Sequence, residues 1–309
     1  MEQENIIRAI HEKYGNIGEN PNSYLKGLVE THPLTYWDYV ETDTLLSLQK
    51  PRTIYKDEVN FLLYNQITEL TLKLILHEIK QITINSNPSE SFLIEKLDRL
   101  NCHTKMLISF FDSMKAAIDY NEYNKFRLAL APASGFQSVQ FRYIELHCTS
   151  LENLINEEGK KRLSVNPGIE ECFEHIYWKD AGINRKTGEK TFTLQQFEGK
   201  YLEELISMAK KLKGNTIEDK ICRIQNPSLE LKEKLKEFDR LYNIEWPLVH
   251  LNIANHYLNN KGENKASTGG SEWKKYLHPQ SQQRKFFPLL WTEAEKYNWG
   301  ELTCKNKTI

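Results

Sequence analysis

The sequence has few of the cysteines on which disulfide-rich and zinc-binding proteins depend. Five cysteines occur in 309 residues, an odd number, and no two of them form a C-x-x-C pair. This spacing argues against a disulfide framework and against a sulfur-ligated zinc site, and it favours reduced thiols in a cytosol. Cys172 and His175 form one C-x-x-H without a second ligand pair, so we interpret them as part of a helix surface.

Long apolar runs and an excess of either charge are also missing. Polar and charged residues, among them Lys73 and Glu78, interrupt the most apolar long segment, residues 61–79, so we expect no membrane-spanning helix. The start, MEQENIIRAI, lacks the order of a secretory signal, and we therefore predict a cytoplasmic protein. Lys and Arg total 41 against 42 for Asp and Glu. This balance gives no broad attraction to nucleic acid or to an anionic membrane, and it favours a small or apolar ligand.

Several common catalytic motifs do not occur. The sequence contains no GxGxxG, GxxxxGK[ST], GxSxG or HExxH. Dinucleotide binding, P-loop chemistry, α/β-hydrolase chemistry and HExxH metal chemistry therefore have no support from the sequence.

Helical periodicity dominates what is present. Apolar residues recur at three- and four-residue spacing in residues 57–82, 92–114 and 229–258, which predicts three long helices, the last kinked by Pro247. LAPASGFQS breaks a fourth helical pattern between residues 120 and 152. We interpret residues 159–193 as connectors with little regular structure. No repeat and no convincing alternation of strand type occurs, so we predict one all-α domain over residues 1–309, built as a helical bundle.

One long loop separates the last predicted helix from the C-terminal residues. Its sequence, NNKGENKASTGGSE at residues 259–272, is rich in Asn, Lys, Gly and Ser, which cannot support a packed core. We predict that this segment is mobile unless a ligand orders it.

His250 lies in the apolar helical segment EWPLVHLNIANHYL, one turn after Trp246. Two interpretations are open: a core histidine that bonds a backbone carbonyl, or a single axial ligand of haem iron, which needs a neutral imidazole held in an apolar wall.

Two further pairs stand four residues apart and so share a helix face. Arg127 follows Tyr123, and this pair is either a clamp for an amino-acid carboxylate or an arginine that covers an aromatic ring. Asn65 follows Phe61, which sets an amide beside an aromatic plate. Asn65 either bonds a neighbouring carbonyl or faces a ligand.

Together, several blocks of sequence resemble the tryptophan 2,3-dioxygenase family, in that family's order. They are LTYWDYVETDTLLSLQKP, DEVNFLLYNQITEL, FRLALAPASGFQSVQFRYIE, W-x-x-x-H, STGGS and FFPLLW. The resemblance implies an all-α bundle that encloses haem b, uses O₂ as a co-substrate and acts in tryptophan catabolism to kynurenine. It also implies a homotetramer, in which the N-terminal arm, residues 1–35, contacts a neighbouring subunit.

The resemblance further implies a role for each matching residue. His250 matches the proximal haem ligand and Trp246 the tryptophan one turn before it. Arg127 matches the carboxylate-binding arginine and Tyr123 the aromatic residue before it, while Phe61 matches a phenylalanine that packs on the indole.

Other matches concern the edges of the site. Ser134 and Gly135 fall at the helix break beside the haem. The resemblance makes residues 259–272 the family's mobile active-site loop. Within it, Thr268 matches a threonine that contacts the ammonium or carboxylate group of the substrate. Tyr36 and Tyr39 match tyrosines that reach toward the pocket of a neighbouring subunit.

The largest departure from the family is Asn65, which replaces a distal histidine that accepts a hydrogen bond from the indole N–H. Ser267 also replaces the first glycine of the loop, and Glu272 and Trp273 follow TGGS. An amide oxygen accepts the same hydrogen bond but does not titrate near neutral pH. Three functions stay open: a dioxygenase giving an N-formylkynurenine, a monooxygenase of a modified tryptophan or another aromatic amino acid in a biosynthetic pathway, and a non-catalytic haem sensor or carrier.

Overall fold

The computed structural model describes residues 2–164, 167–184, 187–259, 265, 267 and 273–301. The chain separates into two compact units, Met1–Lys50 and Pro51–Ile309. The predicted N-terminal arm, residues 1–35, lies within the first unit.

The first unit consists of four helices without a core of their own. They are α1 (Glu2–Gly15), α2 (Pro21–Glu30), α3 (Tyr36–Val40) and α4 (Thr42–Leu46). Side chains cap two of them, because Asn20 accepts a hydrogen bond from the amide of Asn22 and Thr35 accepts one from the amide of Asp38. None of the four helices buries a side chain.

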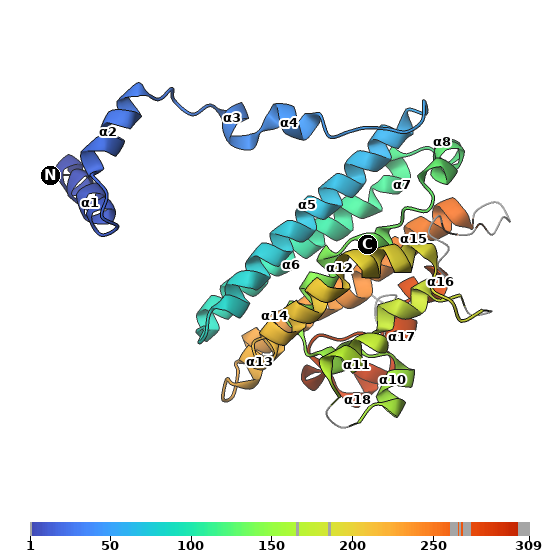
Figure 1. Cartoon of the computed structure of the whole chain (residues 1–309). Helices are drawn as coiled ribbons and strands as arrows, with labels where there is room; N and C mark the ends of the chain where they lie inside the picture. The colour runs from blue at the N-terminus through green and yellow to red at the C-terminus, as the bar shows by residue number, and fades with distance from the viewer. Residues whose placement is uncertain are drawn as a thin grey trace. The chain divides into compact units, whose positions relative to one another are not determined.

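Two long helices form the frame of the second unit. Helix α5 (Asp57–Ile84) and helix α6 (Glu90–Asp112) lie side by side, joined by a short turn that contains Pro88 (Figure 1). Ser89 caps α6 by accepting a hydrogen bond from the amide of Phe92. These bounds confirm the first two helices predicted from the sequence.

The third predicted helix is divided by a π turn. Helix α14 (Leu229–Arg240) continues through the π turn η5 (Leu241–Glu245) into helix α15 (Trp246–Leu258). Pro247 follows directly, and because it has no N–H it cannot donate a hydrogen bond within the helix. The regular α-helical bonding is thus interrupted by a π turn just before Pro247, and the kink expected at Pro247 stays a prediction.

The predicted break between residues 120 and 152 is confirmed. The chain forms α8 (Tyr120–Phe126), then two short 3₁₀ segments, η1 (Arg127–Leu130) and η2 (Gly135–Gln137), and then α9 (Gln140–Cys148). Helix α8 packs on α5 and α15, and α9 packs on α5.

Residues 159–193 are more regular than predicted. They include most of α10 (Glu157–Arg162), all of α11 (Ile169–Glu174) and the 3₁₀ segment η4 (Tyr177–Gly182). Phe173 and Trp178 are buried in a second hydrophobic cluster with Phe197 of α12 (Phe192–Leu212), a helix that was not predicted. Cys172, on α11, is only 2% exposed, so its interpretation as part of a helix surface is wrong. The helices are too short for periodicity to reveal them, so the prediction of connectors is wrong.

Seven short elements complete the described chain. They are α7 (Met114–Ala117), η3 (Leu151–Leu154), α13 (Ile217–Cys222), α16 (Trp273–Leu277), α17 (Pro279–Gln282), η6 (Pro288–Leu290) and α18 (Glu293–Tyr297). Apart from two isolated β-bridges, the described residues contain no strand pairing, which confirms the all-α class.

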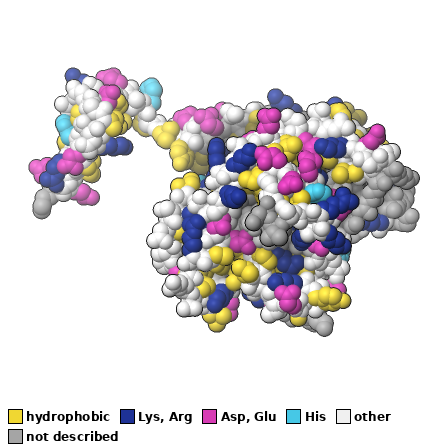
Figure 2. Space-filling view, turned by 60° about the horizontal axis from the view of Figure 1, so that its bottom comes forward, with side chains coloured by type: hydrophobic (Ala, Val, Ile, Leu, Met, Phe, Trp, Pro, Cys, Tyr) yellow, Lys and Arg dark blue, Asp and Glu magenta, His cyan; other side chains and the backbone are white. Residues whose placement is uncertain are grey.

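The surface agrees with the balanced composition. Figure 2 shows side chains of both charges interspersed over one face. Among the described residues, no helix is both long and apolar enough to cross a membrane.

Candidate functional site

The first turns of α5 carry Phe61 and Asn65. Glu58 ties the preceding segment to this end of the helix, because its carboxylate accepts hydrogen bonds of 2.7 Å from the amides of Arg52 and Thr53. The Nδ2 of Asn65 donates to the carbonyl oxygen of Phe61 at 2.7 Å. The interpretation of Asn65 as bonding a nearby carbonyl is therefore confirmed. Since only nitrogen can donate to a carbonyl, this bond turns the amide so that Oδ1 points away from it.

Helix α8 brings Tyr123 and Arg127 to the same place. The ring centroid of Tyr123 lies 5.6 Å from that of Phe61, 5.5 Å from that of Phe126 and 4.4 Å from that of Tyr257 on α15. Burial raises the pKa of Tyr123, while the nearby Arg127 guanidinium acts in the opposite direction. Arg127 is buried. The two residues thus stand together beside Phe61.

His250 lies on α15 within an aromatic wall. Its ring centroid is 5.2 Å from that of Phe111 and 6.0 Å from that of Trp246. Burial alone lowers the pKa of His250 to about 4, so the imidazole is neutral at physiological pH. The side chain of His250 is nevertheless partly exposed to solvent.

These two groups of residues belong to one packed cluster. Phe111, Trp246 and Tyr257 are buried members of the main core, and Phe61 and Tyr123 pack against it. The tertiary fold therefore brings together residues of α5, α6, α8 and α15. What they form is an aromatic-lined site with an arginine and a neutral histidine.

The residues around His250 fit a haem. A neutral imidazole with apolar neighbours is the environment that an axial ligand needs. Within the part of the chain that the structure describes, no hydrogen bond to the His250 ring is found, and the ring is partly exposed, so it is open to a ligand such as an iron atom.

Ser134 and Gly135 stand at the start of η2. The Oγ of Ser134 accepts a hydrogen bond from the amide of Phe136 at 3.3 Å, and its amide donates to the side chain of Gln137 at 3.2 Å. Phe136 packs in the second hydrophobic cluster. The structure therefore gives these residues a capping role, and their contact with haem stays a prediction.

The roles of three other predicted site residues stay predictions. Tyr36 and Tyr39 belong to the first unit, where their exposed fractions are 72% and 77%. Thr268 lies outside the described residues. In the predicted loop, residues 259–272, the structure describes only Asn259, Lys265 and Ser267. Trp273, which follows the loop, is buried at the start of α16 in a cluster that Tyr123 touches.

Sequence reasoning missed a buried polar network beside the site. Arg284 donates to Glu145 at 2.6 Å, and Arg142 donates to Tyr177 at 3.0 Å. Asp239, also buried, accepts hydrogen bonds from the amides of Phe286 and Phe287. The one available signal was a charged pair, Arg-Lys, directly before an aromatic pair in QQRKFFPLLW.

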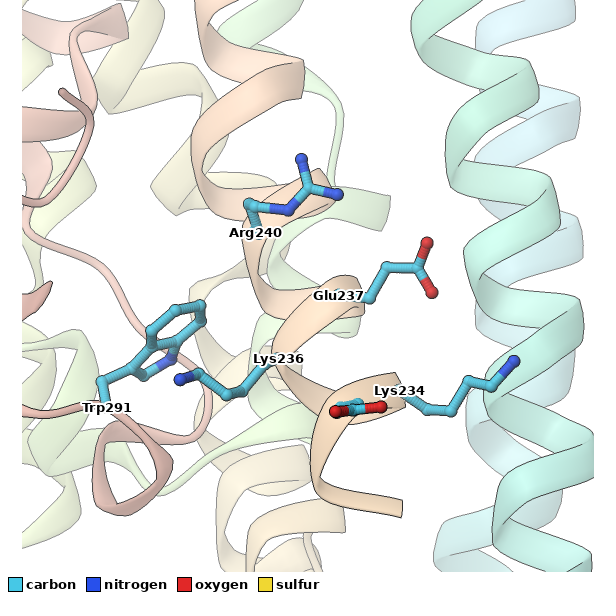
Figure 3. Close-up of a pocket in the computed structure, with 6 residues that line it drawn as sticks. Lys234, Lys236, Glu237, Arg240 and Trp291 are labelled. Atoms are coloured by element: carbon cyan, nitrogen blue, oxygen red, sulfur yellow. The ribbon is translucent and has the colours of Figure 1, made fainter. Parts of the chain in front are cut away.

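A separate surface cleft lies away from the predicted site residues. It measures about 440 Å³, and its lining residues include Lys234, Lys236, Glu237 and Trp291. In Figure 3, Lys236 points toward Trp291, whereas Lys234 and Glu237 point toward α6. The three charged residues form ion pairs with Glu295, Asp98 and Lys105. Their charges are thus already matched.

The fold and the site define an all-helical protein with an aromatic-walled, histidine-containing site. A family model described as tryptophan 2,3-dioxygenase matches residues 25–204. The tryptophan 2,3-dioxygenase of Bacillus thuringiensis subsp. konkukian (strain 97-27) is 26% identical over 283 residues, covering 85% of this chain and 92% of its own. That of Bacillus anthracis is 26% identical over 284 residues, with the same coverage. That of Xanthomonas oryzae pv. oryzae is 35% identical over 114 residues, 36% of this chain and 38% of its own.

The chain belongs to the tryptophan 2,3-dioxygenase family. This membership confirms the family predicted from the sequence and supports the predicted enzyme class, a haem-dependent oxidoreductase. The family match ends before Trp246 and His250. Their roles therefore depend on the geometry described above and on direct tests.

Proposed function

We propose that this protein is a haem-dependent oxygenase of the indole ring of L-tryptophan or of a substituted tryptophan. The proposed reaction is of the 2,3-dioxygenase type, in which both atoms of O₂ enter the product, an N-formylkynurenine. The observation that carries the proposal is that two groups of residues contact the same hydrophobic core in a member of this family. Phe61 and Tyr123 pack against this core, with Arg127 beside Tyr123. His250 lies against Phe111 and Trp246 of the same core.

The cofactor proposed is haem b, with O₂ as co-substrate. His250 would hold the iron through its neutral imidazole, beside Trp246. Ser134 and Gly135 would lie at the haem edge. When bound, haem supplies an iron centre that activates O₂. The chain itself keeps His250 unprotonated, because burial lowers its pKa to about 4.

Substrate binding is assigned to the residues around Phe61 and Tyr123. Arg127 binds the carboxylate of the substrate by charge-assisted hydrogen bonds, and Tyr123 and Phe61 pack on its apolar part. The Oδ1 of Asn65, turned away from the Phe61 carbonyl, accepts the indole N–H. Thr268 binds the ammonium or carboxylate group. Positioning of this kind lowers the barrier by holding the reacting groups together.

We further propose a homotetramer in which Tyr36 and Tyr39 approach a neighbouring subunit's site. The first unit buries no side chain in its helices, so a partner surface would complete it. A stripe of exposed apolar residues on α5, formed by Ile67, Leu70 and Leu74, would be covered in the same way. The reduced thiols expected from the sequence favour a cytoplasmic location.

A second candidate function is a monooxygenase that inserts one oxygen atom into a modified tryptophan or another aromatic amino acid. Asn65 favours it, because an amide cannot act as an acid or base near neutral pH. A sensor or carrier of haem is the third possibility. The Arg127–Tyr123 pair counts against it, since a sensor needs no amino-acid clamp.

Mass spectrometry of products formed under ¹⁸O₂ tests these alternatives. Reduced, haem-loaded protein is given L-tryptophan and, in parallel, ring-substituted tryptophans. Two labelled oxygen atoms in a ring-opened product support the dioxygenase. One labelled atom supports the monooxygenase, and no product from any aromatic amino acid refutes both and leaves the sensor or carrier.

A further inference from the structure

The π turn η5 inserts one extra residue between α14 and α15. The amide of Trp246 donates to the carbonyl of Leu241, five residues earlier, where a regular α-helix uses the fourth. Pro247 has no N–H, so it cannot make the regular bond to Asn243. Such turns are rare and occur frequently at functional sites.

The extra residue changes the direction in which His250 points. Leu231, Leu235 and Phe238 form the buried stripe of α14, the helix that packs on α6. His250 follows Phe238 by twelve positions, which in a regular helix at about 100° per residue would rotate it about 120° from this stripe. Because the π turn accommodates one extra residue, the rotation about the helix axis between His250 and this stripe falls to about 20°.

Contacts with α6 agree with this alignment. The ring centroid of Phe111, on α6, lies 4.8 Å from that of Trp246 and 5.2 Å from that of His250. Trp246 and His250 thus face the helix that the α14 stripe also faces. The π turn is therefore what brings His250 to the aromatic wall.

Hydrogen bonds to Asn243 occupy both ends of its side chain within this turn. Asn243 is 1% exposed. Its Nδ2 donates to Oδ1 of Asp239 at 2.6 Å, and its Oδ1 accepts from Nε of Arg284. One bond therefore reaches back one turn along the same helix, and the other reaches a distant part of the chain.

Arg284 and Asp239 extend these contacts through the core. Arg284 also donates to the carboxylate of Glu145 on α9 at 2.6 Å. Asp239 accepts from Nε1 of Trp291 at 2.8 Å and from the amide of Phe286 at 2.9 Å. Because all of these groups are buried, losing one partner leaves another unsatisfied, and the network is costly to disrupt.

We propose that Asn243 and Arg284 are positioning residues that hold the π turn and thereby set the orientation of His250. The inference rests on the proposed function, since it takes His250 as the haem ligand. Without the Asn243–Arg284 bond, the π turn is no longer tied to the core through Arg284, so its geometry varies and His250 loses its fixed orientation toward Phe111.

Haem titration of three variants tests this role. Asn243→Ala and Arg284→Met remove the bond. Asn101→Ala is the matched control, because Asn101 is also a buried asparagine, 3% exposed. Its Nδ2 donates to the carbonyl of Lys234 and to the carboxylate of Glu237, both on α14 before the π turn. The readouts are the haem dissociation constant, the ferric absorption and electron paramagnetic resonance spectra, and urea unfolding.

The three variants should unfold at similarly lowered urea concentrations but differ in haem binding. We expect the haem dissociation constant to rise at least tenfold in Asn243→Ala and Arg284→Met, with altered ferric spectra, and to stay within twofold of wild type in Asn101→Ala. Equal haem binding in all three variants, whether wild-type or weakened to the same degree, would overturn the proposal.

A deletion variant tests the rotation itself. Deleting Asn243 and replacing Pro247→Ala places His250 eleven positions after Phe238 instead of twelve, so that a regular helix restores a rotation of about 20° between them. Haem binding should then return to within threefold of wild type. A folded deletion variant, checked by circular dichroism, that binds haem as weakly as Asn243→Ala would refute the rotation argument.

His250→Ala separates this inference from the proposed function. If His250→Ala binds haem like wild type, the ligand assignment fails and the proposed function loses its basis. If His250→Ala loses haem while Asn243→Ala keeps it, only the positioning role fails.

Discussion

Asn65 donates through Nδ2 to the carbonyl of Phe61, one turn earlier on α5, at 2.7 Å. The bond fixes which end of the amide faces away from the helix backbone. Where the resemblance to the family implies a histidine, this chain thus presents an acceptor that neither gains nor loses a proton near neutral pH.

Asn65→His should introduce a titratable group into the site. We expect kcat/KM of the variant to show an inflection near pH 6.5 that wild type lacks, because an imidazole changes charge there and an amide does not. The pH profile of L-tryptophan turnover between pH 5.5 and 8.5 measures this. Asn65→Ala is the control that removes the acceptor without adding a charge. Identical profiles and products for wild type and Asn65→His would mean that the residue is incidental.

Arg127→Met should weaken substrate binding and leave haem loading unchanged. A charge-assisted hydrogen bond contributes about 1.5–3 kcal/mol, so the dissociation constant for L-tryptophan should rise about 10- to 150-fold. Difference spectroscopy of the haem-loaded protein measures it. Tryptamine, which lacks the carboxylate, is the matched ligand and should bind both proteins alike. An unchanged affinity for L-tryptophan would refute the clamp.

His147 should make the protein less stable in acid. Burial first, and then the charge of Lys80, lowers the pKa of His147 to about 4, and its Nδ1 lies 3.0 Å from the hydroxyl of Thr83. Because the unfolded chain takes up this proton near pH 6.5 and the folded chain only near pH 4, stability falls as pH falls through that window. The contribution between pH 7 and pH 5 is about 2 kcal/mol.

His147→Asn removes this titration and keeps a polar side chain. We therefore expect its free energy of unfolding in urea to fall less than that of wild type between pH 7 and pH 5. Losses of the same size in both proteins would show that His147 does not carry the effect.

The exposed stripe on α5 should be an interface between copies of the chain. Leu70 and Leu74 are 48% and 45% exposed. Burying a leucine contributes about 1.5–3 kcal/mol, so the double variant Leu70→Glu, Leu74→Glu should raise the dissociation constant of the oligomer at least about tenfold. Sedimentation velocity measures the assembly. Lys73→Glu, a charge change at an exposed position of the same helix, is the control, and an unchanged oligomer in the double variant would exclude this stripe.

The sequence by itself determined the helical class and the residue pairs within single helices. Periodicity of apolar residues identified α5 and α6 because a long helix repeats the same face many times. Phe61 with Asn65, and Tyr123 with Arg127, could be paired because four residues make about one helical turn. The family could be recognised from blocks of sequence without knowledge of their spatial arrangement.

Only the tertiary structure decided which of these pairs contact each other and how the His250 side chain is oriented. Phe61 and Tyr123 contact each other because α5 packs on α8, and no local pattern encodes that packing. The helices of residues 159–193 were missed because each is too short to show a period, and their side chains are buried by α12. The π turn depends on Arg284, which is distant in sequence from Asn243 and reaches it only through the folded core.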